Sequence, residues 1–232
     1  YKGFDQLTLE PSDNVTIAKA DWKMAYKPIV ISGEDMMKNT GERIFDLLEQ
    51  KEQNALESLQ QQFNERFYED GTGNSSKRIT GLKAICAATP TSGTLFGINR
   101  ATATWWRNQY KDTNAVYYAS STDNMTPAML DLWMYCGRVA SGGKKNRYPD
   151  LGLCTETYYK HYHQILQKDQ RFSNTDAADA GFTNLTFMGM TLIPDYDCPA
   201  DASGYAQAYF LNSRFLKLVY HPQRNFTTTA KE

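Results

Sequence analysis

Polar and apolar residues alternate with a period of two near the start of the chain. In the run WKMAYK, residues 22–27, Trp22, Met24 and Tyr26 alternate with two lysines and an alanine. Because successive side chains of an extended segment point to opposite sides, the pattern predicts a hairpin over residues 3–32 with lysines on one face. A two-stranded hairpin is marginal in water on its own. We therefore expect residues 1–31 to form an extended arm that packs on something else.

A period close to four follows. Apolar residues recur at positions 44, 48, 55, 59, 63 and 67 of a stretch, residues 34–69, that has no proline and one internal glycine. Glu, Gln, Lys and Asn fill most other positions, so the stretch predicts a long helix with one buried side. Ser32 is the expected N-cap, and Gly71 follows the end. At about 1.5 Å per residue this helix would span roughly 50 Å, which indicates an elongated molecule.

Later patterns predict helices packed on a sheet. Helices are expected over residues 126–139 and 156–167, and strands over 79–89, over two runs around Gly189, and over two more around Asn212 and Ser213. We find no internal repeat and no linker that separates independent domains. The mixture of helices and antiparallel strands predicts an α+β fold.

Composition and charge exclude several classes. With 41% hydrophobic residues the 232-residue chain can build a core, and 25 basic residues nearly balance 26 acidic ones. The nearly neutral net charge therefore does not indicate binding to nucleic acid or to an anionic membrane. No apolar run reaches the roughly 18 residues that a membrane span needs, and no signal peptide is visible. We expect a chain that is neither membrane-bound nor exported, and Tyr1 at its start suggests a processed or incompletely observed product.

Cysteine and histidine give little support for catalysis. Cys86, Cys136, Cys154 and Cys198 form no CxxC pair, which argues against zinc and predicts reduced thiols. Cys154 precedes His161 by seven residues, a weak candidate for a nucleophile and its base, with His163 and His221 the other histidines. No phosphate-binding glycine loop and no metallopeptidase motif occurs, so we expect no enzyme activity, no cofactor and no metal.

Three further features have a functional and a plainer interpretation. Asp195 and Asp197 are either cation ligands or ordinary turn residues, and the turn is favoured. The loop GGKKNR, residues 142–147, either touches phosphates or is simply solvated. Five Asn-x-Ser/Thr triplets are either glycosylation sites or chance, and they begin at Asn14, Asn74, Asn124, Asn184 and Asn225.

The stretch FGINRATATWWRNQ, residues 96–109, places two adjacent tryptophans between arginines. In extended backbone Trp105 and Trp106 would face opposite sides, so both are buried only between two layers or at a contact with another chain. Tryptophan and arginine are enriched at interface centres. We expect a packing or inter-subunit role, with Arg100 and Arg107 available for ion pairs. Trp22 and Tyr26 of the arm are further candidates for an inter-subunit contact.

Most of the chain also carries, in order, YKPIVISGEDM, NTGERIFDLLEQK, DGTG with ITGLKAI, FGINRATATWWRNQ and FLNSRFLKLVYHPQRNF. Together these segments resemble the major capsid proteins of tailed bacteriophages, of the Hong Kong 97 type. The most specific are Gly-Ile-Asn-Arg…Trp-Trp-Arg and Tyr-Phe-Leu-Asn…Lys-Leu. The resemblance implies a protruding extended hairpin at residues 1–31. It further implies a spine helix and peripheral domain from 32–100 plus 190–232, and an axial domain from 101–189.

The same resemblance implies a function. Such proteins form pentamers and hexamers that close an icosahedral shell around double-stranded DNA, so the chain would belong to the virion capsid and assemble in the bacterial host cytoplasm. Scaffolding, portal and decoration proteins would be its partners, with non-specific contact to the packaged DNA. Two alternatives stay open: a secreted glycoprotein or carbohydrate-binding module, suggested by the triplets, and an encapsulin-like compartment shell protein with the same fold.

Overall fold

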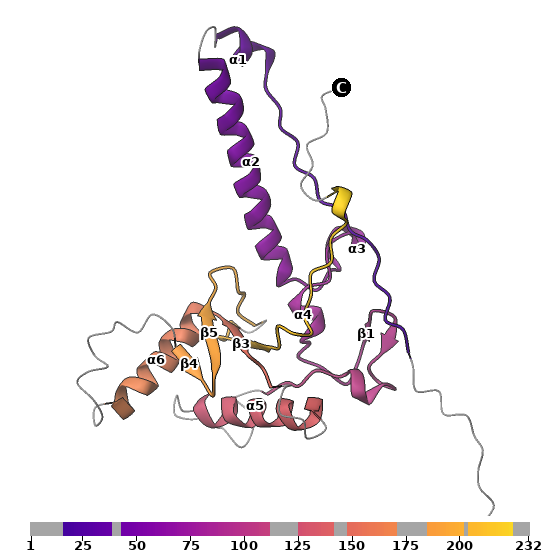
Figure 1. Cartoon of the computed structure of the whole chain (residues 1–232), viewed down its shortest axis with the longest axis vertical. Helices are drawn as coiled ribbons and strands as arrows, with labels where there is room; N and C mark the ends of the chain where they lie inside the picture. The colour runs from indigo at the N-terminus through magenta and orange to yellow at the C-terminus, as the bar shows by residue number, and fades with distance from the viewer. Residues whose placement is uncertain are drawn as a thin grey trace, which may run out of the picture.

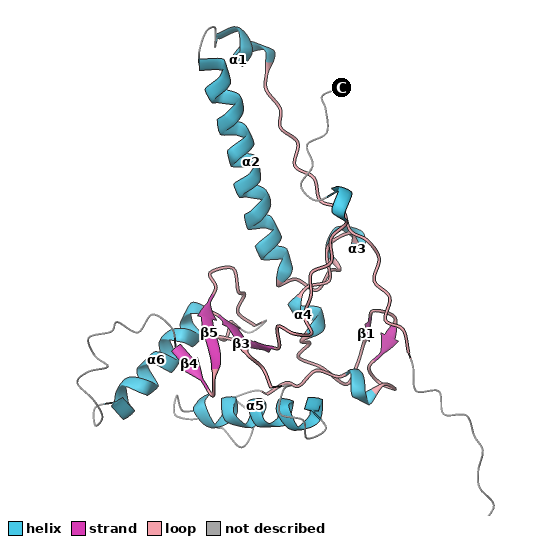
Figure 2. Cartoon of the chain, in the orientation of Figure 1, coloured by secondary structure: helices cyan, strands magenta, loops and turns pink. Residues whose placement is uncertain are grey.

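The computed structural model describes residues 16–38, 43–111, 125–141, 148–170, 185–201 and 204–224. A four-stranded sheet and several helices gather at one end of the molecule, and one long helix projects from that body (Figure 1). The molecule is elongated, as the sequence indicates. Helices and strands are both present in the described residues (Figure 2), which confirms the α+β class.

The long helical stretch is described as two helices, α1 (Gly33–Lys38) and α2 (Arg43–Phe67). Residues 39–42, between them, lie outside the described residues. Along α2, Ala55, Leu59 and Phe63 are half-buried, which confirms the predicted stripe in that part. The far turns of α2 project beyond the sheet and only its C-terminal end enters a core (Figure 1).

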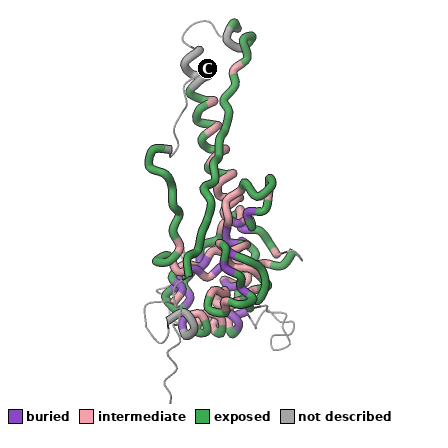
Figure 3. The backbone as a smooth tube through the Cα atoms, turned by 90° about the vertical axis from the view of Figure 1, so that its right-hand side faces the viewer, coloured by how far each residue is buried: buried purple, intermediate pink, exposed green. Residues whose placement is uncertain are grey.

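The arm differs from the prediction. Residues 16–32 are extended, but they form no strand with one another or with other described residues. They run beside α2 and in the opposite direction, and their exposure is visible in Figure 3. The predicted hairpin is therefore wrong for these residues, while residues 1–15 lie outside the described ones. Alternation of polar and apolar residues indicates extended backbone, but it does not show that a partner strand is present.

The sheet has the strand order β4 (Leu185–Phe187), β5 (Met190–Pro194), β3 (Leu151–Cys154), β6 (Ala208–Leu211). β3 is parallel to β5 and antiparallel to β6, and β4 and β5 form an antiparallel hairpin. The hairpin turn contains Gly189 with φ +83°, a conformation that glycine adopts readily. The two helices predicted in the second half are confirmed as α5 (Met125–Ser141) and α6 (Glu156–Gln170).

Each face of the sheet has its own core. On one face α5 and α6 pack on β4 and β5, with Met129, Tyr162 and Met190 among the buried residues. On the other face the end of α2 and α4 (Leu82–Ile85) pack on β3 and β6 through Tyr68, Leu82, Tyr209 and Leu211. Tyr209 and Phe210 are consecutive in β6 and contribute to opposite cores. The sheet thus joins the long helix to the helical layer.

Two predicted strands are wrong. Residues 79–89 form the short helix α4 and irregular backbone, and Gly81 lies against carbonyls at and just after the end of α2, where a side chain would strike Phe67 O and Glu69 O. Residues 216–221, after the turn that follows β6, are extended without a partner strand among the described residues and lead into the 3₁₀ helix η4 (Pro222–Arg224). Neither segment has the continuous hydrogen-bonding partner that a strand requires.

The expected domain boundary between residues 189 and 190 is also wrong. It falls between the paired strands β4 and β5 and would divide one sheet, since β5 and β6 both pair with β3. Strand partners come from distant parts of the chain, so chain order alone places this boundary incorrectly. β5 and β6 therefore belong to the same sheet as β3 and β4.

Candidate assembly surface

The arm presents its lysines inward and its large apolar side chains outward. Lys23 Nζ donates to Ser76 O at 2.6 Å, and Lys27 Nζ donates to Ser58 Oγ of α2 at 2.9 Å. From α2, Lys51 Nζ donates to Val30 O at 3.2 Å. The two arm lysines attach the odd-numbered side of the arm to Ser76 and to α2, and the Lys51 contact attaches the arm backbone to α2. On the even-numbered side, Met24 and Tyr26 face away from the subunit, while Trp22 contacts His221.

All residues from 16 to 30 are exposed, and from residue 22 onward the large apolar side chains of the even-numbered side are more exposed than Ile29, at 40%. The even-numbered residues Trp22, Met24, Tyr26 and Val30, which we call the outward row, are 68%, 85%, 87% and 77% exposed. Ile31, the odd-numbered neighbour of Val30, is half-buried. Large apolar residues on free monomers are normally scattered singly, so four in one row indicate a contact surface. Sequence reasoning selected Trp22 and Tyr26 and missed Met24 and Val30, although the same alternation contains all four.

The C-terminal segment adds apolar surface next to the arm. Trp22 and His221 meet edge to face with ring centroids 6.1 Å apart. Phe215, Leu218, Val219 and Tyr220, just before His221, are also exposed. The outward row and this segment together form an apolar strip at the side of the molecule, and no described residue covers it.

The stretch 96–109 is a compact corner and not an extended segment. The short strands β1 (Thr94–Leu95) and β2 (Ile98–Asn99) pair around Phe96 and Gly97, and η1 (Thr104–Trp106) is a 3₁₀ turn. Trp105 and Trp106 contact each other edge to face, with centroids 5.7 Å apart. They do not face opposite sides of extended backbone, so that expectation is wrong because the chain turns at this point.

The two tryptophans differ in their surroundings. Trp106 is half-buried and its indole Nε1 donates to Leu95 O at 3.2 Å, which ties η1 to β1. Trp105 is 65% exposed. Trp106 thus stabilises the corner, whereas Trp105 remains available at the surface for contact with another molecule.

Arg100 and Arg107 bind backbone carbonyls. Arg107 donates from Nε to Arg100 O at 2.7 Å and from an Nη to Ala101 O at 2.8 Å. Arg100 is buried, donates to Ile85 O at the end of α4 at 2.7 Å, and has its pKa lowered by burial. The predicted ion pairs are not found for either arginine among the described residues. Both hold loops together because carbonyl oxygens accept from the guanidinium fork.

Asp195 and Asp197 anchor the long helix to the sheet. Asn64 Nδ2, on α2, donates to Asp195 Oδ1 at 3.2 Å and to Asp197 Oδ2 at 2.8 Å. Tyr68 OH donates to Asp195 Oδ2 at 2.7 Å, and burial followed by this hydrogen bond raises the pKa of the phenol. The backbone N–H of Asp197 donates to Asp195 Oδ1 at 3.0 Å, which confirms the turn interpretation. No signal in the sequence pairs these aspartates with α2, because the partners are 127 to 133 residues apart.

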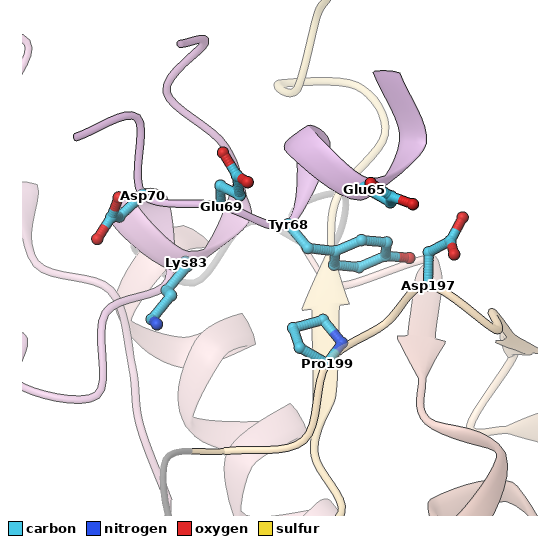
Figure 4. Close-up of a pocket in the computed structure, with 7 residues that line it drawn as sticks. All are labelled: Glu65, Tyr68, Glu69, Asp70, Lys83, Asp197 and Pro199. Atoms are coloured by element: carbon cyan, nitrogen blue, oxygen red, sulfur yellow. The ribbon is translucent and has the colours of Figure 1, made fainter. Parts of the chain in front are cut away.

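An open pocket of about 230 Å³ lies beside this junction (Figure 4). Four carboxylates and one amine surround it, with Tyr68 and Pro199 as apolar walls; the charged residues are Glu65, Glu69, Asp70, Asp197 and Lys83. Within the described ranges, no group of three or more His, Cys, Asp or Glu residues is arranged so that it could hold a metal ion.

The Cys–His candidate is not assembled as a catalytic pair. Cys154 is fully buried in β3, and burial raises the pKa of its thiol to about 12, so it is protonated at neutral pH. Its Sγ contacts Ile193 O at 3.6 Å, while His161 and His163 lie on α6. A catalytic thiol needs the opposite shift. All four cysteines are free thiols, as predicted.

Some sequence candidates lie outside the described residues. These are the basic loop 142–147 and the triplets at Asn14, Asn124, Asn184 and Asn225. Asn74 is described and exposed, with φ +52° in α3 (Gly73–Ser76). Within the part of the chain that the structure describes, no helix is long and apolar enough to span a membrane.

Comparison with known proteins gives a likeness to solved structures. No family model matches the chain, and no curated protein matches it significantly. Among solved structures, it is similar to a chain of the cyanophage A-1(L) capsid asymmetric unit, with a TM-score of 0.54 and 21% identity over 74% of this chain. The match covers 51% of that chain, so this chain spans about half its length. The likeness shows a shared fold.

Proposed function

We propose that this chain is a structural capsid protein of a bacteriophage, whose copies associate with one another to build the shell. The observation that carries the proposal is the outward row, Trp22, Met24, Tyr26 and Val30, which is exposed on an arm already held by its lysine side. The fold shared with a chain of a cyanophage capsid supports the same conclusion. A second copy is then the natural cover for the row.

The energetics favour association. Burying one large apolar side chain contributes about 1.5–3 kcal/mol, so four such residues supply a sizeable driving force, reduced by the entropy of ordering the arm. Contacts that repeat by rotation close into rings, and many modest contacts per subunit stabilise a shell collectively. Local ordering of the arm by lysine contacts keeps the entropic cost of association low.

The finer assignment is a major capsid protein of the Hong Kong 97 type. In it, pentamers and hexamers close an icosahedral shell around double-stranded DNA in the host cytoplasm, with scaffolding, portal and decoration proteins as partners. The net charge of −1 suits a wall that touches DNA without binding it tightly. A structural role without catalysis is part of the proposal, and the protonated, buried Cys154 supports it.

The test is assembly of the purified chain, followed by electron microscopy and sedimentation over a range of protein and salt concentrations, with and without a scaffolding protein. We expect rings or closed shells in place of monomers. The variant Met24→Ser/Tyr26→Ser should shift the material toward monomer, while Tyr196→Ser, a matched control at 88% exposure, should not. Monomers alone under every condition would contradict the proposal, and shells filled with an enzyme instead of DNA would favour a compartment protein.

A further inference from the structure

The polarity of the arm is the reverse of what a surface segment normally shows. Such a segment buries its apolar side on the body and turns its charges toward water. Here Lys23 and Lys27 are directed at the subunit's own helices, and Met24 and Tyr26 point outward. The lysine side is therefore the one that attaches the arm, and the apolar side is the one left for another molecule.

The two hydrogen bonds that attach the arm to α2 have the same spacing on the arm and on the helix. Lys27 and Val30 are three residues apart in extended chain, a distance of about 10 Å at roughly 3.3 Å per residue. Their partners Ser58 and Lys51 are seven residues apart on α2, which is about 10.5 Å and close to two full turns. Both partners consequently lie on one face of α2. An extended segment and a helix running in opposite directions meet here in register.

Two more contacts attach the arm to the subunit on the N-terminal side of Lys27. Lys23, four residues before Lys27 on the same side of the arm, reaches Ser76 O in α3. Beyond it, the backbone N–H of Lys19 donates to Phe96 O at 2.9 Å. The arm is thus fixed at intervals along its length, and Trp22 of the outward row also contacts the subunit through its side chain, at His221.

We propose that Lys23, Lys27 and Lys51 are positioning residues that dock the arm on α2 and α3 in the free subunit and so present the outward row to a second copy of the chain. This inference rests on the proposed function, since it names how one copy prepares to bind the next. The lysines do not contact the second copy. They determine which side of the arm it meets.

The side chains of the outward row indicate which kind of molecule binds there. The even-numbered positions from 22 to 30 are Trp22, Met24, Tyr26, Pro28 and Val30, without a charge. A nucleic acid or an anionic membrane would require the lysines to face outward, and they are engaged on α2 and α3. An apolar protein surface fits, and a second copy carries one in its own exposed Phe215, Leu218, Val219 and Tyr220.

Because these side-chain hydrogen bonds lie at the surface and outside both cores, the arm can be released without unfolding either core. The test measures the distance between the arm and α2 in the monomer, below the concentration at which the chain assembles. Nitroxide spin labels are attached at Ala20→Cys on the arm and Gln53→Cys on α2, and electron spin resonance gives the distribution of distances between them. Cys86 and Cys136, which are half-buried, are replaced by alanine in this background. We expect a narrow distance distribution in the parent, and a broad one in Lys23→Gln/Lys27→Gln. Lys160→Gln, on the distant α6, is the control and should leave the distribution narrow.

Assembly is then measured on the chain with its natural cysteines. We expect Lys23→Gln/Lys27→Gln to raise the concentration needed for association about five- to tenfold, with unchanged thermal unfolding of the monomer. Met24→Ser/Tyr26→Ser should keep the narrow distance and lose association, which separates positioning from contact. A broad distribution in the parent, or no effect of the lysine variant on it, would overturn docking even if shells form. A docked arm on a chain that never associates would instead refute the proposed function and the presentation role.

Discussion

The ring of Tyr148 occupies the space that a side chain at Gly137 of α5 would fill, so that an added Cβ would overlap the ring atoms. Tyr148 also stacks on Trp133 of the same helix, with ring centroids 4.2 Å apart and an angle of 21° between the planes. Gly137 is therefore required by packing and not by the helix. This aromatic contact joins α5 to the segment that leads into β3.

Gly137→Ala tests the packing directly. In an isolated helix the change is favourable by about 1 kcal/mol. Here we expect it to destabilise the protein by about 1–3 kcal/mol, because the Tyr148 ring must move and lose its stacking on Trp133. Chemical denaturation measures the effect. The double variant Gly137→Ala/Tyr148→Ala should be more stable than the sum of the single changes, and strict additivity would refute the overlap.

The two tryptophans of the 96–109 corner should respond differently to substitution. Trp106→Phe removes the hydrogen bond to Leu95 O and part of a half-buried ring, so we expect a loss of about 1–2 kcal/mol in unfolding free energy. Trp105→Phe changes an exposed ring and should stay within about 0.5 kcal/mol. Equal losses for both variants would show that the corner does not depend on the Trp106 bond.

Tyr68→Phe should weaken the junction between α2 and the sheet. The phenol is buried and donates to the Asp195 carboxylate, and a hydrogen bond to a charged group contributes about 1.5–3 kcal/mol. We expect a loss in that range, with the largest increase in hydrogen exchange at the C-terminal end of α2. Tyr196→Phe, at an exposed ring in the same loop, is the control and should have no measurable effect.

Asp150 should make stability depend on pH in the acid range. The hydroxyl and backbone N–H of Ser213 donate to its carboxylate and hold its pKa below the ordinary value of 3.8. A lowered pKa in the folded state stabilises the protein above about pH 3.8, and that stabilisation is lost as the pH falls through the folded-state value.

Asp150→Asn should therefore lower the unfolding free energy at neutral pH and flatten its decline below about pH 4. Urea denaturation at a series of pH values measures both effects. Asp21→Asn, on the exposed arm, is the control. An unchanged slope in Asp150→Asn would mean that the Ser213 contact does not form in solution.

Local patterns in the sequence were sufficient where the determining interactions are local. The four-residue spacing of apolar positions predicts α2 and α6 because a helix makes its hydrogen bonds within itself. Gly189 marks the β4–β5 hairpin for the same reason, since a tight turn depends on one residue with positive φ. The scattered cysteines correctly indicated free thiols.

Contacts between distant residues decided the rest. The sequence cannot show that Asn64 and Tyr68 contact Asp195. Nor can it show that the end of α2 lies against Gly81, or that β3 pairs with both β5 and β6. The same limit explains the error over the tryptophans, because adjacent residues face opposite sides only if the chain stays extended.

The arm shows both contributions together. By itself the sequence determined that Lys23 and Lys27 share one side and Trp22, Met24 and Tyr26 the other, because alternation is a property of extended backbone. Only the tertiary structure decided which side faces the subunit, because that choice depends on Ser58 and Ser76, which are 31 and 53 residues further along the chain from their lysines. Hydrogen-bond acceptors for the amines lie there, and the apolar side is left exposed.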